Sequence, residues 1–169
     1  MNTCVLCFKP HNNLWRDEPN MYCEQCVPIR DTARNKADNI TDNVYLGDMM
    51  SAATFDGIRV CVHERGPTYH GQCLCVPVLT SSPRSKYDRT GAVASIAALD
   101  AVSDLIESYV GKDEKIIVHC YGGIERSPLA LVWWLTRSKR YDNINEAYEF
   151  IKTKRPAVSP RLFWLPTEE

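Results

Sequence analysis

The residues best suited to chemistry stand together in the segment 119–128, which reads HCYGGIERSP. It contains a cysteine, Cys120, and an arginine six positions later, Arg126. A cysteine attacks as its thiolate, and the pKa of a reactive cysteine falls to about 3.5–7.5 where amide groups at a helix start face it. Gly122 and Gly123 allow the positive-φ conformations that turn successive N–H groups toward one centre. The segment therefore predicts that Cys120 attacks the phosphorus of a phosphate ester and forms a phosphocysteine.

The same loop is expected to bind phosphate. Amide donors at a helix N-terminus and the helix dipole favour an anion, and the planar guanidinium of Arg126 can hold two phosphate oxygens. The expected cradle consists of Tyr121, Gly122, Gly123, Ile124, Glu125 and Arg126. The alternative is a buried strand cysteine followed by a glycine turn, since cysteine is often only a small core residue. The order of strand, cysteine, glycines, arginine and helix favours the phosphate loop.

A strand and a helix must hold this loop in place. Residues 115–118 form a short, mostly apolar run, and the segment 129–139 begins with the helical sequence LALVWWL. Periodicity also predicts helices over 90–110 and 144–154, and Gly111 suits the end of the first of these. Strands that alternate with helices indicate an α/β fold with a central, mostly parallel sheet flanked by helices. In such sheets ligands bind at the carboxyl ends of the strands, which is where the loop stands.

The loop and its flanks resemble a known family. Residues 119–127 match HCxxGxxRS, the signature of cysteine-dependent protein phosphatases, and the pattern over residues 40–165 is similar to the dual-specificity branch. The flanking segments that carry this likeness are 43–47, 52–53, 57–62, 73–78, 155–156, 159–160 and Phe163.

The resemblance implies roles for four residues. Cys120 corresponds to the nucleophile and Arg126 to the phosphate-binding arginine. Ser127 corresponds to the hydroxyl that assists breakdown of the phosphocysteine, and His119 to the histidine that supports the loop. One departure stands at Arg161, where the family more often carries asparagine, so the closing segment is expected to brace the loop differently.

The reaction also needs a proton donor for the leaving oxygen, and one carboxyl group can protonate that oxygen and later activate water. In the family an aspartate does this, often directly after a strand like 76–78. Thr80 stands at that place and cannot donate usefully, so we expect a longer loop over 80–87 to deliver Asp88 as the general acid. The alternative is that Asp88 is a first-turn residue of the following helix.

Four cysteines form a second pattern near the N-terminus. Cys4 and Cys7 make one C-x2-C pair, and Cys23 and Cys26 make another after fifteen residues. This spacing is typical of zinc sites, and a segment this short buries little apolar surface, so the metal would supply its folding energy. The alternative is two disulfides, which need an oxidising compartment.

The chain is expected to have two parts. The cysteine pairs define a zinc-binding segment over 1–37, in which a helix is expected over 27–36. A polar linker over 38–43 then leads into the catalytic domain, assigned to 38–169. The N-terminal residues show no basic stretch followed by an apolar run, so we expect no secretory signal and an intracellular protein. Catalysis itself is expected to need no cofactor.

Composition limits the partners. The chain carries 20 basic and 21 acidic residues, for a formal charge of −1, and this balance gives no support for a general nucleic-acid surface. Its apolar runs are far shorter than the roughly 20 residues that a membrane helix needs. We expect phosphorylated proteins as substrates and a protein partner for the zinc segment.

The sequence favours hydrolysis of phosphate monoesters on phosphotyrosine, phosphoserine or phosphothreonine of proteins, and other functions stay open. If no acid reaches the loop, the domain would bind phosphorylated residues without turnover, and the zinc segment could act as an adaptor. An RNA 5′-triphosphatase or a phosphoinositide phosphatase would share the loop, but Glu125 would repel a polyanion if it faced the site.

Overall fold

The computed structural model describes residues 2–4, 6–11, 15–17, 20–85 and 88–166. Its centre is a five-stranded sheet in the order β5-β6-β11-β7-β8. These strands are β5 (Ala37–Thr41), β6 (Val44–Gly47), β7 (Ile58–Cys61), β8 (Leu74–Cys75) and β11 (Ile116–His119). β6, β11, β7 and β8 run parallel as neighbours, and β5 pairs antiparallel with β6 at the edge. The expected mostly parallel α/β sheet is therefore confirmed.

β11 is the central strand, and all four of its residues are buried. A parallel strand that is covered on both faces reads as a continuous apolar run, which explains the sequence Ile116-Ile117-Val118. Its last residue, His119, lies in register with Gly47 of β6 and Cys61 of β7. The chain therefore leaves the middle of the sheet at Cys120.

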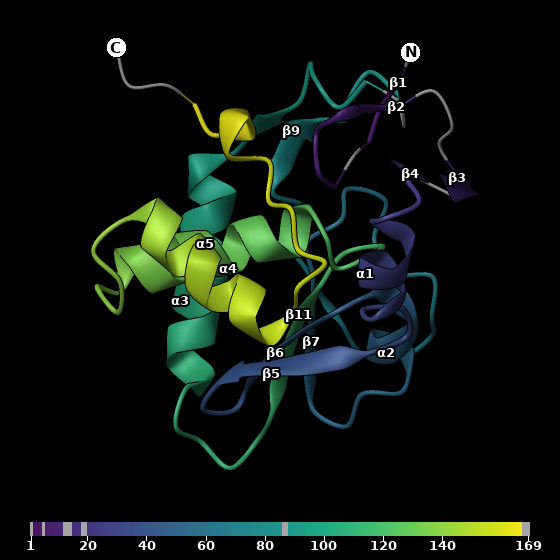
Figure 1. Cartoon of the computed structure of the whole chain (residues 1–169). Helices are drawn as coiled ribbons and strands as arrows, with labels where there is room; N and C mark the ends of the chain where they lie inside the picture. Colours follow the sequence, from purple (N-terminus) through teal and green to yellow (C-terminus); the bar gives the residue numbers. More distant parts are fainter. Residues whose placement is uncertain (1, 5, 12–14, 18–19, 86–87, 167–169) are drawn as a thin grey trace.

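Three helices gather on one side of the sheet: α3 (Ile96–Tyr109), α4 (Arg126–Arg137) and α5 (Ile144–Lys154). α4 packs against both of the others and against β11 (Figure 1). A helix that is apolar on most sides must be buried, and α4 fits this rule because Leu129, Leu131, Trp134 and Leu135 are all within the core. The helix that follows the phosphate loop is thus fixed along its whole length.

Shorter elements complete the fold. α2 (Met49–Ala53) follows β6 and is capped by Asp48, whose carboxylate accepts from the Ser51 amide at 2.8 Å. The remaining elements are β1 (Asn2–Thr3), β2 (Pro10–His11), β3 (Trp15–Asp17), β4 (Asn20–Tyr22), α1 (Val27–Asp31), β9 (Leu79–Ser81), β10 (Val93–Ala94) and the 3-10 helix η1 (Leu162–Trp164).

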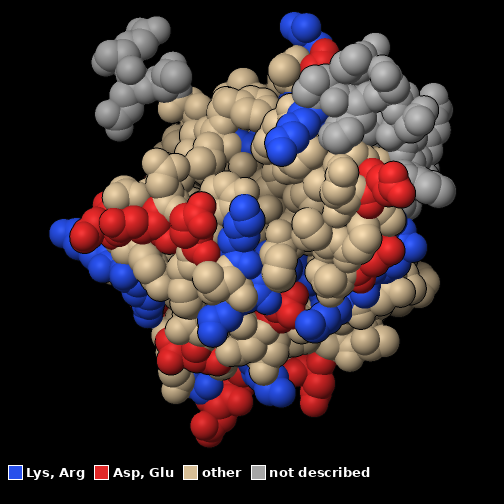
Figure 2. Space-filling model, in the orientation of Figure 1, with Lys and Arg blue, Asp and Glu red and all other residues tan. Residues whose placement is uncertain are grey.

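The distribution of charge on the surface is relevant to the partners expected from the sequence. Acidic and basic side chains are interspersed over the face shown in Figure 2, without one continuous basic area on it. Within the described residues, none of the helices is both long and apolar enough to cross a bilayer.

Several expected boundaries were wrong. The helix predicted over 90–110 begins only at Ile96, because Ser95 caps it with its hydroxyl 3.2 Å from the Ala98 amide. The residues before it include β10, which pairs with β9 instead of extending the helix. Gly111 follows the helix with φ of +77°, as expected for the residue after the last helical turn.

The region around residue 37 also differs from expectation. The helix predicted over 27–36 ends at Asp31, and Asn35 adopts φ of +57° in the turn that follows. The expected polar linker 38–43 is mostly the edge strand β5, in which Ile40 is buried and its neighbours are not. The strand has only one buried apolar residue, and its polar residues Asp38 and Asn39 are consecutive, so the sequence lacks the alternation that would have indicated a half-buried strand.

Candidate active site and metal site

Cys120 lies at the carboxyl end of β11, buried at the base of a turn that leads into α4. Gly123 shapes this turn with φ of +66°. A Cβ at Gly123 would stand 2.6 Å from both the Arg155 guanidinium and the Gly47 carbonyl oxygen, whereas a Cβ at Gly122 would meet nothing closer than Ile124 at 3.6 Å. Of the two glycines that allow a positive φ in this turn, Gly123 adopts one and Gly122 does not.

The carbonyl groups of the turn point away from Cys120 and accept hydrogen bonds from the surrounding structure. The pairs are Tyr121 O with Met49 N at 2.9 Å, Gly122 O with Arg155 Nη2 at 3.2 Å, Gly123 O with Arg155 Nε at 3.0 Å and Ile124 O with Ser159 N at 2.7 Å. In a trans peptide the N–H points opposite to the carbonyl. The amides that follow these carbonyls therefore face the other side of the turn, as an anion cradle requires.

Ser127 contacts the side chain of Cys120, and His119 contacts its backbone. The Ser127 hydroxyl lies 3.2 Å from the cysteine Sγ and is fully buried, so it can donate to a thiolate. His119 Nδ1 lies 3.2 Å from the Cys120 carbonyl oxygen, and its Nε2 lies 2.8 Å from the Tyr69 hydroxyl. Burial lowers the pKa of His119 to about 4, so the ring is neutral and orders the chain here.

A cavity of about 560 Å³ opens over Cys120 and Arg126. The expected cradle residues line it, except Gly123, which is turned toward Arg155 and Gly47. Three other segments complete the wall: the start of α2, with Met49, the turn after β7, which includes His63, and the loop after β9, which includes Arg84. A phosphate on Arg126 would therefore sit between four separate parts of the chain.

In this structure the carboxylate of Glu64 pairs with the guanidinium of Arg126. Arg126 Nε donates to Glu64 Oε1 at 2.6 Å and Nη2 donates to Oε2 at 2.8 Å, while the Ser82 hydroxyl donates to Oε2 at 2.7 Å. Burial opposes ionisation of Glu64, but Arg126 outweighs it and lowers the pKa to about 2. Sequence reasoning missed this residue, because a glutamate in a turn carries no local signal of its partner.

Glu125 explains the unusual arginine at position 161. Its buried carboxylate accepts from Arg161 Nε at 2.7 Å, and from Arg89 Nη2 at 2.5 Å and Nε at 3.0 Å. Burial raises the pKa of Glu125, but the charges of Arg161 and Arg89 outweigh it and lower the pKa overall. Glu125 therefore ties the loop to the closing segment and to the loop after β9, and its charge is already neutralised.

Asp88 lies away from the cavity in the structure. Its carboxylate accepts from the Thr90 amide at 3.0 Å and from the Thr90 hydroxyl at 2.5 Å, and it is absent from the described residues that line the cavity. These hydrogen bonds lower the pKa of Asp88. The structure does not bring Asp88 to Cys120, and its role as general acid stays a prediction that requires its loop to move.

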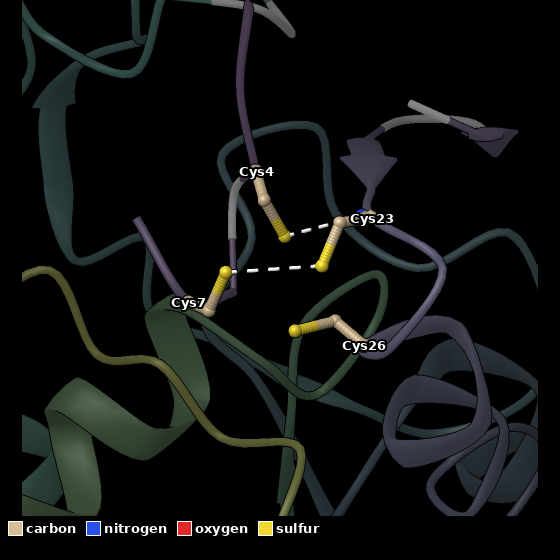
Figure 3. A group of neighbouring side chains, drawn as sticks. All are labelled: Cys4, Cys7, Cys23 and Cys26. Carbon is tan, nitrogen blue, oxygen red and sulfur yellow. Dashed lines mark hydrogen bonds between the residues drawn. The ribbon is translucent and has the colours of Figure 1, made fainter. Parts of the chain in front are cut away.

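The four N-terminal cysteines converge on one centre (Figure 3). Their sulfur atoms all lie within 4.8 Å of one another, and Cys7 Sγ and Cys23 Sγ are 3.8 Å apart. A tetrahedral zinc ion with Zn–S distances of about 2.3 Å separates its sulfurs by about 3.8 Å. Cys4, Cys7, Cys23 and Cys26 thus fit a zinc site.

The cysteine cluster packs directly on the phosphate loop. Ile124 belongs to the same buried apolar cluster as Cys4, Tyr22, Cys23 and Cys26. The fully buried guanidinium of Arg155 donates to the carbonyls of Ala33 and Lys36 at 3.1 and 2.8 Å, as well as to the loop. The N-terminal segment therefore forms part of the wall behind the loop.

Residues 68–166 match the family described as dual specificity phosphatase, catalytic domain. The chain is 38% identical to human dual specificity protein phosphatase 16 over 155 residues, which covers 87% of this chain and 22% of that protein. It is 31% identical to human dual specificity protein phosphatase 4 over 155 residues, covering 85% of this chain and 36% of that protein. The chain spans less than half the length of the curated relatives it matches.

Two solved structures share the fold. Human DUSP28 superposes with a TM-score of 0.56 at 20% identity, covering 76% of this chain and 86% of that one. The human tyrosine phosphatase-like serine/threonine/tyrosine-interacting protein superposes with a TM-score of 0.60 at 14% identity, covering 78% and 91%.

The two loop glycines should respond differently to an added methyl group. Gly123→Ala combines a disfavoured φ with a close approach to backbone, and such strain costs about 1–3 kcal/mol. We expect it to weaken binding of inorganic phosphate about tenfold or more, measured by calorimetry. Gly122→Ala is the matched control and should bind phosphate nearly as the native chain does. Equal losses in both variants would contradict this account of the turn.

The buried Glu125–Arg161 pair should contribute strongly to stability. Arg161→Met leaves a buried carboxylate with one cationic partner fewer, and breaking such a pair costs about 3–5 kcal/mol. Urea unfolding should show a loss of free energy at the lower end of this range, because Arg89 remains as a partner of Glu125. Arg137→Met, which removes an exposed arginine paired with Asp104, should change the free energy of unfolding little. Similar values for the two variants would show that Arg161 does not act through burial.

Proposed function

This chain belongs to the dual specificity phosphatase family, and on that premise we propose that it hydrolyses phosphate monoesters of phosphotyrosine, phosphoserine and phosphothreonine in proteins. The observation that carries the proposal is the sulfur of Cys120, which lies 3.2 Å from the Ser127 hydroxyl inside a turn whose carbonyls all point outward. This geometry supports a thiolate nucleophile beside an anion cradle.

The proposed reaction has two displacements. The thiolate of Cys120 attacks phosphorus, so that the P–S bond forms while the bond to the leaving oxygen breaks, and that oxygen takes a proton from the carboxylic acid expected in this role, Asp88, once its loop has moved to the cavity. Arg126 and the inward amides hold the equatorial phosphate oxygens, where charge develops. Water then attacks the phosphocysteine and gives a proton to the same carboxylate, and the Ser127 hydroxyl donates to the sulfur as the P–S bond breaks. His119 takes no proton in this scheme and orders the backbone at Cys120.

The substrate class rests on the family and not on the charge of the loop. Glu125 is paired with the buried Arg161 and the partly buried Arg89, so it would not repel a polyanion as the sequence suggested. Arg65 and Arg84 also line the cavity, and they suit acidic peptides around a phosphorylated residue. Phosphopeptides, a phosphoinositide and a 5′-triphosphorylated RNA should therefore be compared directly, with turnover of phosphopeptides expected.

Cys120→Ser should separate chemistry from binding. A serine hydroxyl is a far weaker nucleophile than a thiolate, so release of phosphate from a phosphotyrosine peptide should fall below detection. The cradle remains, so the dissociation constant for the same peptide should stay within about tenfold of the native value. A native protein that binds the peptide but releases no phosphate would instead indicate a phospho-residue binding module.

We further propose that residues 1–37 hold a structural zinc ion through the four cysteines. Two tight turns support the site: the Phe8 amide donates to the Cys4 carbonyl at 3.0 Å, and the Cys26 amide donates to the Cys23 carbonyl at 2.9 Å. When bound, the ion would supply folding energy to a segment with little core. Because this segment packs on Ile124, its order supports the phosphate loop. An additional protein partner for it stays a proposal without a contact to support it.

Loss of one zinc-binding thiolate should show whether the phosphate loop depends on the zinc segment. Cys26→Ala should lower the zinc content per chain, lower the melting temperature and weaken phosphate binding together, measured by metal analysis, calorimetric scanning and titration. A chelator should have the same effect on the native chain. Cys75→Ala, which removes an exposed cysteine outside the cluster, is the control and should change none of the three. Full zinc content in Cys26→Ala would contradict the assignment.

A further inference from the structure

We infer that the rings of Tyr121 and His63 make this site selective for phosphotyrosine over phosphoserine and phosphothreonine. The inference rests on the proposed phosphatase function and names the phosphorylated residue that the site prefers. Both side chains line the cavity over Cys120. They would contact the aromatic ring of the substrate, which a phosphorylated serine or threonine lacks.

The nucleophile lies at the base of a deep wall. Cys120 is 2% exposed, whereas Tyr121, the next residue and part of the same cavity lining, is 48% exposed. The wall therefore extends from solvent at Tyr121 down to the buried sulfur. A phosphotyrosine side chain has a ring between its backbone and its phosphate, so it can span this depth, while phosphoserine has a single methylene group there.

Tyr121 combines a fixed backbone with an exposed ring. Its carbonyl oxygen accepts from the Met49 amide at 2.9 Å, which holds the backbone in place. The ring is one of the large apolar side chains that the described part of the chain leaves exposed. A tyrosine offers a large contact area and loses little conformational entropy on binding, because it has only two side-chain torsions. The ring of Tyr121 is thus suited to contact a ligand.

His63 extends the aromatic surface. Its ring centroid lies 6.5 Å from that of Tyr121, with the planes inclined by 54°, and aromatic pairs interact at centroid separations of about 4.5–7 Å. His63 Nδ1 accepts from the Arg65 amide at 3.1 Å, which orients the ring. Burial and the charge of Arg126 lower the pKa of His63, so the ring is neutral near pH 7. The two rings together form an uncharged aromatic wall.

Apolar side chains continue this wall toward the cysteine. Met49 and Ile124 also line the cavity, and both are largely buried. A methionine thioether makes favourable contacts with the edge of an aromatic ring. The substrate ring would therefore be surrounded by apolar or aromatic groups from three segments, which are the start of α2, the turn after β7 and the loop after Cys120.

The charged groups of the cavity would not separate the three phosphorylated residues. Arg126 and the loop amides contact the phosphate, which is the same in each. Arg65 and Arg84 are exposed at the wall, and they would attract acidic neighbours equally in each peptide. Specificity is a difference between affinities, so it must come from the ring. Among the described residues that line the cavity, Tyr121 and His63 are the aromatic ones.

The test measures binding without chemistry. Three peptides that differ only in carrying phosphotyrosine, phosphoserine or phosphothreonine are titrated into Cys120→Ser in a calorimeter, so that leaving-group reactivity does not enter. The phosphotyrosine peptide should bind about tenfold more tightly than the other two, or better. In the same background Tyr121→Ala should reduce this ratio by about threefold to tenfold, the range that one aromatic contact supplies. Tyr121→Phe keeps the ring and should preserve the ratio.

Further variants separate ring contact from general damage. His63→Ala should reduce the ratio, and His63→Phe should retain it. Phe163→Ala is the matched control, because Phe163 is an exposed aromatic residue outside the described lining of the cavity, and it should leave the ratio unchanged. A variant that only disturbs the fold would weaken all three peptides alike and would not change the ratio.

Two results would overturn the inference. Equal affinities of Cys120→Ser for the three peptides, including no measurable binding of any, would show that the cavity does not distinguish the ring. A preference for phosphotyrosine that both Tyr121→Ala and His63→Ala leave intact would place its source elsewhere. Phosphate release by the native chain tests the proposed function separately. If no peptide is hydrolysed but the binding preference is present and depends on the two rings, the phosphatase function fails and the selectivity stands.

Discussion

The structure depends on one constraint at the turn from Cys120 to Arg126. If the amide groups of this turn face a bound anion, its carbonyl groups must face the surrounding protein. Each outward carbonyl needs a donor, because an unpaired backbone acceptor inside a protein costs free energy comparable to a lost hydrogen bond. The donors come from distant segments: Met49 at the start of α2, Arg155 at the end of α5, and Ser159 in the closing segment. The rest of the fold can be understood as the scaffold that brings these donors to one place.

Arg155 carries the largest share of this task. Its buried guanidinium donates to two loop carbonyls and to two carbonyls of the segment after α1, and it pairs with Asp38 at 3.0 Å. A planar fork with five donors suits such a junction better than lysine would. Through this side chain the cysteine segment, the edge of the sheet and the phosphate loop share one set of hydrogen bonds.

The charged groups around the cavity form ion pairs between glutamates and arginines. Two glutamates contact arginines of the site: the buried Glu125 pairs with Arg89 and Arg161, and the partly exposed Glu64 pairs with Arg126 and accepts from Ser82. The first pair is buried from solvent and is structural. The second lies at the cavity wall, where an anionic ligand can replace the carboxylate on Arg126.

Local sequence was sufficient for the elements whose signals are local. The buried strand Ile116–His119, the cysteine, the glycine at 123 and the apolar helix that follows lie in one continuous segment, so their order predicted the loop and the parallel sheet around it. The C-x2-C pairs likewise indicated a four-cysteine cluster, because each pair is short enough to form one turn. The edge strand Ala37–Thr41 was missed, since Ile40 is its one buried apolar residue and the polar residues around it resemble a linker.

What depends on contacts between distant residues was decided only by tertiary structure. Nothing near Glu64 in the sequence indicates that it pairs with Arg126, and nothing near Arg161 indicates that it pairs with Glu125. The same holds for Ile124, which joins the loop to the cysteine cluster, and for Asp88, which the chain directs toward Thr90. Side-chain partners of this kind are set by how strands and helices pack, because the carboxyl ends of neighbouring strands meet at one edge of the sheet whatever their separation along the chain.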